Sequence, residues 1–152
     1  GSLGHGLSLA AGTALGYRLQ EQHGQVFCLT SDGEWQEGST WESLIFACHH
    51  RLENLTILVD HNRLQGFGET GDIASMAPLW EKLQGFELDL QIIDGHDLDA
   101  LRSALAHHVP RPRLIVLETI KGKGVSFMEN NPKFHGSAPT ADEMKLALQE
   151  LQ

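Results

Sequence analysis

The chain has 152 residues, of which 41% are hydrophobic, enough for one domain with a substantial core. Its formal net charge of −9 at pH 7 argues against a nucleic-acid partner, because binding a phosphate backbone requires clustered Lys and Arg. No apolar run approaches the roughly 18 residues of a transmembrane helix, so we expect no membrane span.

The first third of the chain predicts a helix, a strand and a second helix. Small and apolar residues recur at helical spacing over Gly4–Gln22. The apolar stretch QVFCLT, residues 25–30, predicts a strand. A second helix is expected over 35–50, with acids in its first turn, and one face of this helix would carry Trp41, Leu44, Ile45 and Cys48.

The rest of the chain continues the alternation of apolar strands and amphipathic helices. The expected elements are strands at 55–60, 90–94 and 113–119, helices at 77–85 and 97–108, Gly-rich or long loops at 61–72 and 121–140, and a last helix from Thr140. Asp97 is an expected N-cap, and Thr140 has the spacing of a capping box with Glu143. This order predicts an α/β fold whose parallel sheet is covered by helices on both faces.

Polar residues follow two of the expected strands. In open parallel sheets, ligands bind beyond the carboxyl ends of the strands, near a topological switch point. Asp32 and Asn62 each follow an apolar strand, and a right-handed strand–helix–strand unit can bring them together. A carboxylate and an amide oxygen suit Mg²⁺ or Ca²⁺, with a loop carbonyl, water and phosphate oxygens completing the coordination.

Gly33 follows Asp32 and leaves room for a phosphate group, while the helix behind it would direct free N–H groups to the same place. The alternative is that Asp32 and Gly33 form a simple strand-to-helix turn. His61 and His96 are expected at the same edge of the sheet, where either could contact a ligand. Cys28 and Cys48 lie in apolar segments, as expected of core thiols in a reducing compartment, which favours a cytoplasmic location.

Five segments together resemble the transketolase family. The stretch SDGEWQEGSTWESLIFACHHRLENLTILVDHN is similar to the thiamine diphosphate-binding motif, in which Gly-Asp-Gly is followed one strand later by Asn. The segments GSLGHGLSLAAGTAL, IDGHD, TIKGKG and FHGSAPT resemble transketolase segments in the same order. The resemblance covers essentially all 152 residues, and Ser31 departs from it where the family usually has Gly.

The resemblance implies a three-layer α-β-α thiamine diphosphate-binding fold with a mostly parallel sheet. It also implies ligands for Mg²⁺, for which Ca²⁺ can substitute: the side chains of Asp32 and Asn62 and the backbone carbonyl of Leu64. Gly33 and Glu34 are expected against the diphosphate. The segment expected at the aminopyrimidine side of the cofactor is Gly1, Ser2 and Leu3.

Two further residues, His135 and Glu37, match family positions, and Lys121 is a candidate phosphate contact. His135 corresponds to a histidine near the diphosphate and the substrate, and it is the expected catalytic residue. Lys121 could neutralise a phosphate or could be a solvated loop lysine. Glu37 corresponds to a carboxylate at the subunit interface of a dimer, although an acid near a helix N-terminus is also favourable without any partner.

The activity implied by the resemblance is transfer of a two-carbon ketol unit between sugar phosphates, as in the pentose phosphate branch of carbohydrate metabolism. Residues 1–152 resemble a single diphosphate-binding domain, the small subunit of a split transketolase, without the family's upstream segment. A pyrimidine-binding domain, in a partner chain or a missing C-terminal half, would complete the active site of a homo- or hetero-oligomer. We therefore expect little activity from the isolated chain.

Two alternatives remain open from the sequence. The first is a fragment of an enzyme similar to deoxyxylulose-phosphate synthase, which shares the diphosphate motif. The second is a non-catalytic module for cofactor binding or assembly.

Overall fold

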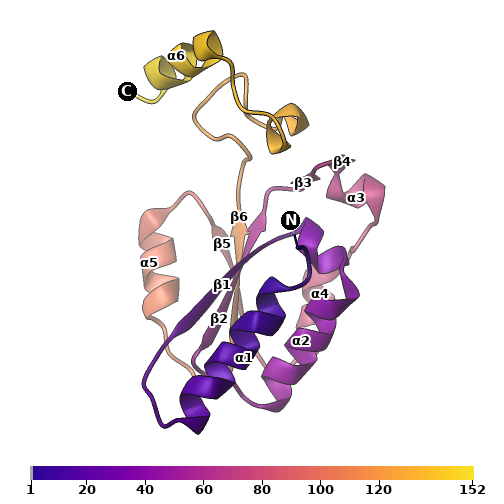
Figure 1. Cartoon of the computed structure of the whole chain (residues 1–152), viewed down its shortest axis with the longest axis vertical. Coiled ribbons are helices and arrows are strands. Elements are labelled where there is room, and N and C mark those ends of the chain that lie inside the picture. Colours follow the sequence, from indigo (N-terminus) through magenta and orange to yellow (C-terminus); the bar gives the residue numbers. More distant parts are fainter. Residues whose placement is uncertain (1) are drawn as a thin grey trace.

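The computed structural model describes residues 2–152, and a four-stranded sheet forms its centre (Figure 1). All the pairings in this sheet are parallel. The strands lie in the order β1 (Val26–Ser31), β2 (Leu55–His61), β6 (Arg113–Glu118) and β5 (Asp89–Asp94). The predicted α/β class with a mostly parallel sheet is thus confirmed.

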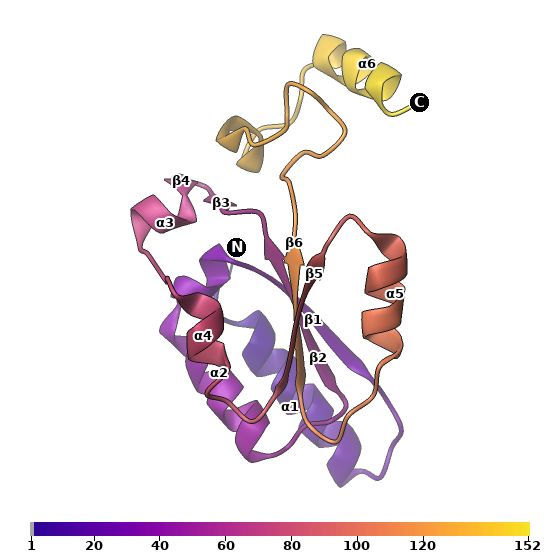
Figure 2. The same cartoon turned by 180° about the vertical axis from the view of Figure 1, so that it is seen from behind.

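Helices lie on both faces of the sheet because each parallel pair needs a crossover connection. One face carries α1 (Gly6–Leu19), α2 (Gly38–His49) and α4 (Leu79–Leu83), and the other carries α5 (Leu98–Ala106) (Figures 1 and 2). The main core lies on the three-helix face, where apolar side chains from helices and strands pack together; its fully buried members include Leu7, Leu44, Ile57, Val59 and Leu114. No helix in residues 2–152 combines the length and apolar character that crossing a membrane requires.

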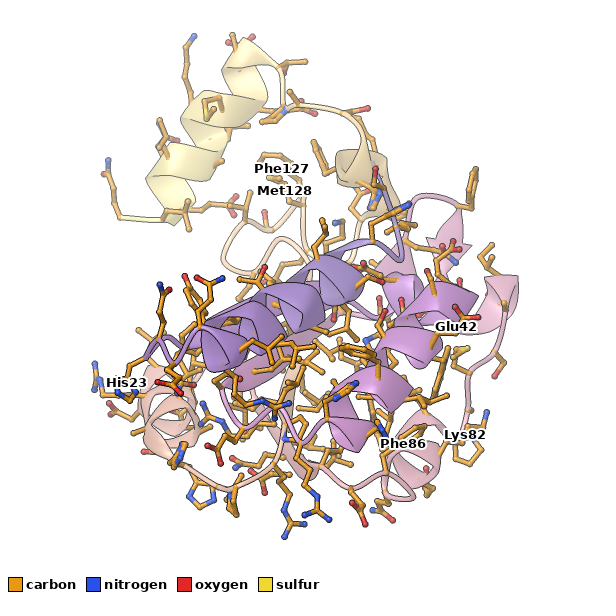
Figure 3. All side chains as sticks on the ribbon, turned by 60° about the horizontal axis from the view of Figure 1, so that its bottom comes forward. His23, Glu42, Lys82, Phe86, Phe127 and Met128 are labelled. Carbon is orange, nitrogen blue, oxygen red and sulfur yellow. The ribbon has the colours of Figure 1, made fainter. Side chains whose placement is uncertain are left out.

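The second predicted helix is broken near its start. A 3-10 turn, η1, covers Gly33–Gln36, and α2 begins only at Gly38 because Glu37 is extended, with φ −88° and ψ 129°. Glu37 is therefore the N-cap residue of α2, and the prediction of acids in its first turn was wrong. Of the residues expected on one face of this helix, Leu44 and Cys48 are buried, whereas Ile45 is 57% exposed. Near the start of α2, the ring centroids of Trp41 and Phe86 lie 6.3 Å apart, which packs the chain after α4 against α2 (Phe86 is labelled in Figure 3).

The strand β1 is an edge strand in the described part of the chain. Its Cys28 and Thr30 side chains are buried, whereas Phe27 and Leu29, which alternate with them, are 54% and 68% exposed. The single helix α5 packs on β5, at the opposite edge of the sheet. Coverage of the sheet is therefore complete on one face and partial on the other.

The Gly-rich loop after β2 has more structure than the sequence predicts. Two short antiparallel strands, β3 (Leu64–Gln65) and β4 (Gly68–Glu69), form a hairpin, and α3 (Thr70–Ile73) follows it. This hairpin projects beyond the carboxyl edge of the sheet (Figure 1).

Residues 121–152 form a C-terminal arm that stands beyond the same edge of the sheet (Figures 1 and 2). The arm contains η2 (Pro132–His135) and α6 (Ala141–Glu150). Glu150 accepts hydrogen bonds from the backbone N–H and the hydroxyl of Ser126, and the Phe127 and Phe134 ring centroids are 5.7 Å apart (Figure 3). The arm is thus held together mainly by its own contacts.

The capping box at the start of α6 is confirmed, and it predicts a local effect. Thr140 Oγ1 accepts from the Glu143 N–H at 3.2 Å, and Glu143 Oε2 accepts from the Thr140 N–H at 2.7 Å. We expect Thr140→Ala to cost about 1 kcal/mol of local helix stability. The amides of Glu143 and Met144, which donate to the side chain and the carbonyl of Thr140, should then exchange with solvent about fivefold faster, as measured by hydrogen exchange.

The control is Ser137→Ala, which removes an exposed hydroxyl three residues earlier. Equal exchange rates in the two variants would contradict the capping role. The hydrogen bond from the Thr140 N–H, helped by Lys133, holds the pKa of Glu143 below its ordinary value. The stabilisation that the Glu143 carboxylate gives to the start of α6 is therefore present above the ordinary carboxyl pKa. It is lost as the pH falls through the lowered pKa of Glu143.

Candidate functional site

The carboxyl ends of β1 and β2 bring the two predicted polar segments together. Ser31 pairs with Asp60 in the sheet, and the Asp32 N–H donates to the Asp60 carbonyl at 3.1 Å. After β2 the chain turns at Arg63, and the backbone N–H of Arg63 donates to Asp32 Oδ2 at 2.6 Å. The structure therefore places Asp32 against the loop that begins at Asn62, as the strand–helix–strand connection predicts.

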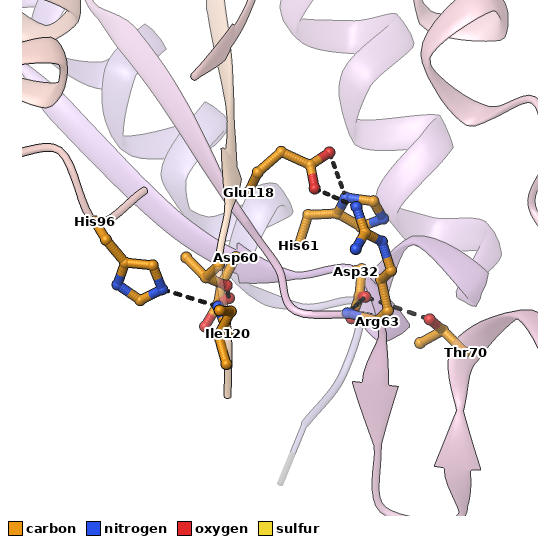
Figure 4. A network of polar contacts seen from close by, with 9 residues as sticks. Asp32, Asp60, His61, Arg63, Thr70, His96, Glu118 and Ile120 are labelled. Carbon is orange, nitrogen blue, oxygen red and sulfur yellow. Dashed lines mark hydrogen bonds and ion pairs between the residues drawn. The ribbon is translucent and has the colours of Figure 1, made fainter. Parts of the chain in front are cut away.

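The Asp32 carboxylate is buried, with only 4% of the residue exposed. Its Oδ1 accepts from the Gly33 N–H at 2.8 Å, and its Oδ2 accepts from Thr70 Oγ1 at 3.3 Å as well as from Arg63 (Figure 4). Burial raises the pKa of Asp32, while the hydrogen bonds from Arg63 and Gly33 oppose this rise. Within residues 2–152, its hydrogen-bond donors are all neutral, so the carboxylate is suited to a cation.

Asn62 is held inside the same loop. Its Oδ1 accepts from the Leu64 N–H at 2.9 Å, and its Nδ2 donates to Asp60 Oδ1 at 3.3 Å. An amide oxygen has two lone pairs, so Oδ1 retains the capacity to bind a cation. The hydrogen-bonded turn thus keeps the predicted metal ligands Asn62 and Leu64 beside Asp32.

Gly33 lies where two loops approach closely. A Cβ at this position would stand 3.3 Å from the Gln65 Cβ, a tight contact that would require the hairpin to shift by a few tenths of an ångström. Gln65 Nε2 donates to Gln36 Oε1 at 3.0 Å, and Gln36 Nε2 donates to the carbonyls of Thr70 and Ala74. These glutamines tie η1 to the loop after β2, and the sequence had no local signal for them.

Glu118 connects two residues of the site and was also missed from the sequence. Its Oε1 lies 2.9 Å from His61 Nδ1, and its Oε2 pairs with the Arg63 guanidinium (Figure 4). Arg63 has a positive φ of 65°, so its backbone is in the left-handed region. The Arg63 side chain is 65% exposed, so the ion pair adds little, and the hydrogen bond from the Arg63 N–H to Asp32 is the main hold on this part of the loop. His96 is used structurally, since its Nε2 accepts from the Ile120 N–H at 2.8 Å.

The N-terminal turn lies against the segment after β1. Gly1 lies outside the described residues, whereas Ser2 and Leu3 are exposed. Glu34 Oε1 accepts from the Gly4 N–H at 3.1 Å, so this carboxylate faces the turn. Ser31 Oγ accepts from the Glu34 N–H at 3.3 Å, which gives the hydroxyl at this departure from the family pattern a structural partner.

The other predicted residues are spread around this centre. His135 lies in η2, and a Cβ on Gly66 would stand 3.3 Å from its ring, so the C-terminal arm touches the β3–β4 hairpin. Lys121 begins the arm, and its carbonyl accepts from the Asn130 N–H at 2.9 Å. Among the described residues, no hydrogen bond or ion pair joins Lys121 or Glu37 to Asp32.

A cavity of about 410 Å³ opens beside the Asp32 carboxylate. Its lining includes His61, Thr70, Met76, Pro78 and Trp80. Residues 2–152 hold no cluster of three or more His, Cys, Asp and Glu side chains that could bind a metal ion. The predicted magnesium site has one carboxylate, one amide oxygen and one backbone carbonyl, so it would not count as a cluster of this kind.

Comparisons with known proteins agree on one family. The family model described as "Transketolase, thiamine diphosphate binding domain" matches residues 1–152. The chain is 38% identical to one of the subunits of apulose-4-phosphate transketolase from Actinobacillus succinogenes, over 100% of this chain and 56% of that protein. It is 37% identical to the 6-deoxy-6-sulfo-D-fructose transketolase subunit SqwG of a Clostridium species, with the same coverage.

The fold is similar to that of a transketolase of known structure. The crystal structure of transketolase from Campylobacter jejuni superposes with a TM-score of 0.92 and 26% identity, over 99% of this chain and 25% of that one. The chain thus spans about half the length of these curated subunits and a quarter of the C. jejuni enzyme.

Proposed function

Because the chain belongs to the transketolase family, within its thiamine diphosphate binding domain, we propose that it binds thiamine diphosphate through Mg²⁺. The protein containing it would transfer a two-carbon ketol unit between sugar phosphates. The observation that carries this proposal is the hydrogen bond from the Arg63 N–H to Asp32. This bond holds the buried carboxylate beside the Asn62–Leu64 turn, which carries the other two predicted metal ligands.

The residues present fit a magnesium diphosphate group. The side chains of Asp32 and Asn62 and the carbonyl of Leu64 would hold Mg²⁺, and this oxygen-only set is the type that Mg²⁺ or Ca²⁺ prefers. Asp32 is buried and its hydrogen-bond donors are neutral, so burial disfavours its ionised form. A bound cation would stabilise the ionised carboxylate, which supports a cation at this position. The side-chain direction of Gly33 is filled by Gln65, so a contact of Gly33 with the diphosphate would be made by its backbone.

The protein residues would bind and orient the cofactor and the substrate. Bound thiamine diphosphate supplies the carbon nucleophile and the electron sink that two-carbon transfer requires. His135, on the arm that touches the hairpin, would contact the diphosphate and the substrate. Lys121 would offset phosphate charge, and Ser2 and Leu3 would meet the aminopyrimidine end.

We further propose that residues 1–152 are one diphosphate-binding domain that works with a pyrimidine-binding domain. That domain would belong to a partner chain or to another part of the same protein. Two of the similar proteins are themselves named as transketolase subunits, which supports a split enzyme. Glu37, exposed at the N-cap of α2, would lie near the interface, and the enzyme would work in the cytoplasm.

Calorimetry on the complete protein, purified with any subunit that it binds, tests the proposal. We expect thiamine diphosphate to bind in the presence of Mg²⁺ and to be released by a chelator. Adding the pyrimidine-binding subunit should then give two-carbon transfer from a ketose phosphate, which donor and acceptor profiling would define. Absence of binding would refute the proposed function, and binding without any turnover beside that subunit would favour a non-catalytic module.

A further inference from the structure

Both backbone polar groups of Gly4 are held by the segment that follows β1. Its N–H donates to Glu34 Oε1 at 3.1 Å, and its carbonyl accepts from Ser39 Oγ at 2.9 Å. Gly4 is buried, although its neighbours Ser2, Leu3 and His5 are exposed. We call this arrangement of Gly4, Glu34 and Ser39 the Gly4 clamp.

The clamp accepts only glycine at its centre. Gly4 has a φ of +80°, in the region that L side chains rarely adopt. A Cβ at this position would lie 2.3 Å from Ser39 Oγ and 3.0 Å from the Glu37 Cβ. The N-terminal turn is therefore held at close range by three residues from one short segment, Glu34–Ser39.

The clamp is also linked to the predicted magnesium site. Glu34 comes two residues after Asp32, and its own N–H donates to Ser31 Oγ at 3.3 Å, directly before the site. The Glu34 carboxylate points toward the start of α1, since it would stand 3.6 Å from a Cβ on Gly6. A carboxylate has no proton to donate and would repel a diphosphate, so this position favours holding the turn over binding the anion.

We propose that Glu34 and Ser39 are positioning residues that fix Ser2 and Leu3 relative to Asp32 and Gly33. The inference rests on the proposed function, in which these two segments meet the ring end and the diphosphate end of the cofactor. In this proposal Glu34 acts on the cofactor through Gly4, in place of the contact with the diphosphate that the family resemblance implies. The clamp fixes the distance between the two ends of the binding site before the cofactor arrives.

This role predicts a selective loss of affinity. With the complete protein and Mg²⁺, Glu34→Ala should weaken thiamine diphosphate binding about tenfold, the effect typical of removing an orienting partner. Affinity for inorganic pyrophosphate, which lacks the rings, should stay within about twofold of wild type, since a twofold change is below half a kcal/mol. Glu34→Gln retains an acceptor for the Gly4 N–H and should restore most of the binding.

Two matched variants make the test specific. Ser8 Oγ in α1 and Ser43 Oγ in α2 lie 2.6 Å apart, in a contact that includes no residue of the clamp. Ser8→Ala removes that contact without touching Gly4, and it should leave both affinities unchanged. Ser39→Ala removes the second bond of the clamp at an exposed residue, and it should reproduce the selective loss even if Glu34→Ala does not fold.

The possible outcomes separate the inference from the proposed function. Equal weakening of both ligands by Glu34→Ala and by Ser39→Ala would overturn the inference, because these residues would then act at the diphosphate. Wild-type binding with no change in either variant would overturn it as well. If wild type bound neither ligand, the proposed function would fail first and the inference with it.

Discussion

Asp32→Ala should weaken binding of Mg²⁺ and thiamine diphosphate about 10²–10⁴-fold in the complete protein. The reason is that a cation at this site would form an ion pair with a carboxylate that is 4% exposed. Removing one partner of a buried ion pair typically costs about 3–5 kcal/mol, which corresponds to that change in dissociation constant. Titration calorimetry with Mg²⁺ and either thiamine diphosphate or inorganic pyrophosphate measures the effect, and both ligands should lose affinity.

The matched control is Asp72→Ala in α3, which removes the same charge from an exposed position. It should change both affinities by less than about twofold, because exposed charges are screened by solvent and salt. If Asp32→Ala and Asp72→Ala bound the cofactor equally well, the assignment of the magnesium site would be wrong.

Trp35→Ala should cause the largest loss of folding stability among the residues around the site. Trp35 is fully buried in η1, and its indole N–H donates to Thr30 Oγ1 at 3.3 Å. Its ring meets Trp41 edge to face with the centroids 5.4 Å apart, and its carbonyl accepts from the Trp41 indole N–H. Replacing a buried Trp by Ala typically costs about 3–5 kcal/mol, which thermal or urea unfolding would measure.

Trp35→Phe provides the comparison. It keeps an aromatic ring against Trp41 but loses the hydrogen bond to Thr30, so its loss should be clearly smaller than that of the alanine variant. Trp35 stands two residues after Gly33, and its packing also anchors the turn that carries the proposed diphosphate contact. A loss below about 1 kcal/mol for Trp35→Ala would show that this anchor is not needed, since ordinary surface substitutions cost less than that.

The sequence by itself determined the order of the elements and their local signals. Apolar strands separated by amphipathic helices predicted the parallel sheet, and the caps at Asp97 and Thr140 were found where they were predicted. The close approach of Asp32 to the chain after Asn62 followed from the handedness of one connection. These features depend on the spacing of residues near one another in the chain, which a single sequence displays directly.

Tertiary structure decided the features that depend on distant partners. Glu118 reaches His61 and Arg63 across 57 and 55 residues of sequence, and Glu34 reaches Gly4 across 30. The apolar run of β1 does not reveal that Phe27 and Leu29 lie on an uncovered edge strand, because burial on both faces depends on which elements pack there. In the same way, the sequence does not explain why Ser31 departs from the family pattern. The structure shows that Ser31 Oγ accepts a hydrogen bond from the Glu34 N–H, because η1 folds back over the end of the strand.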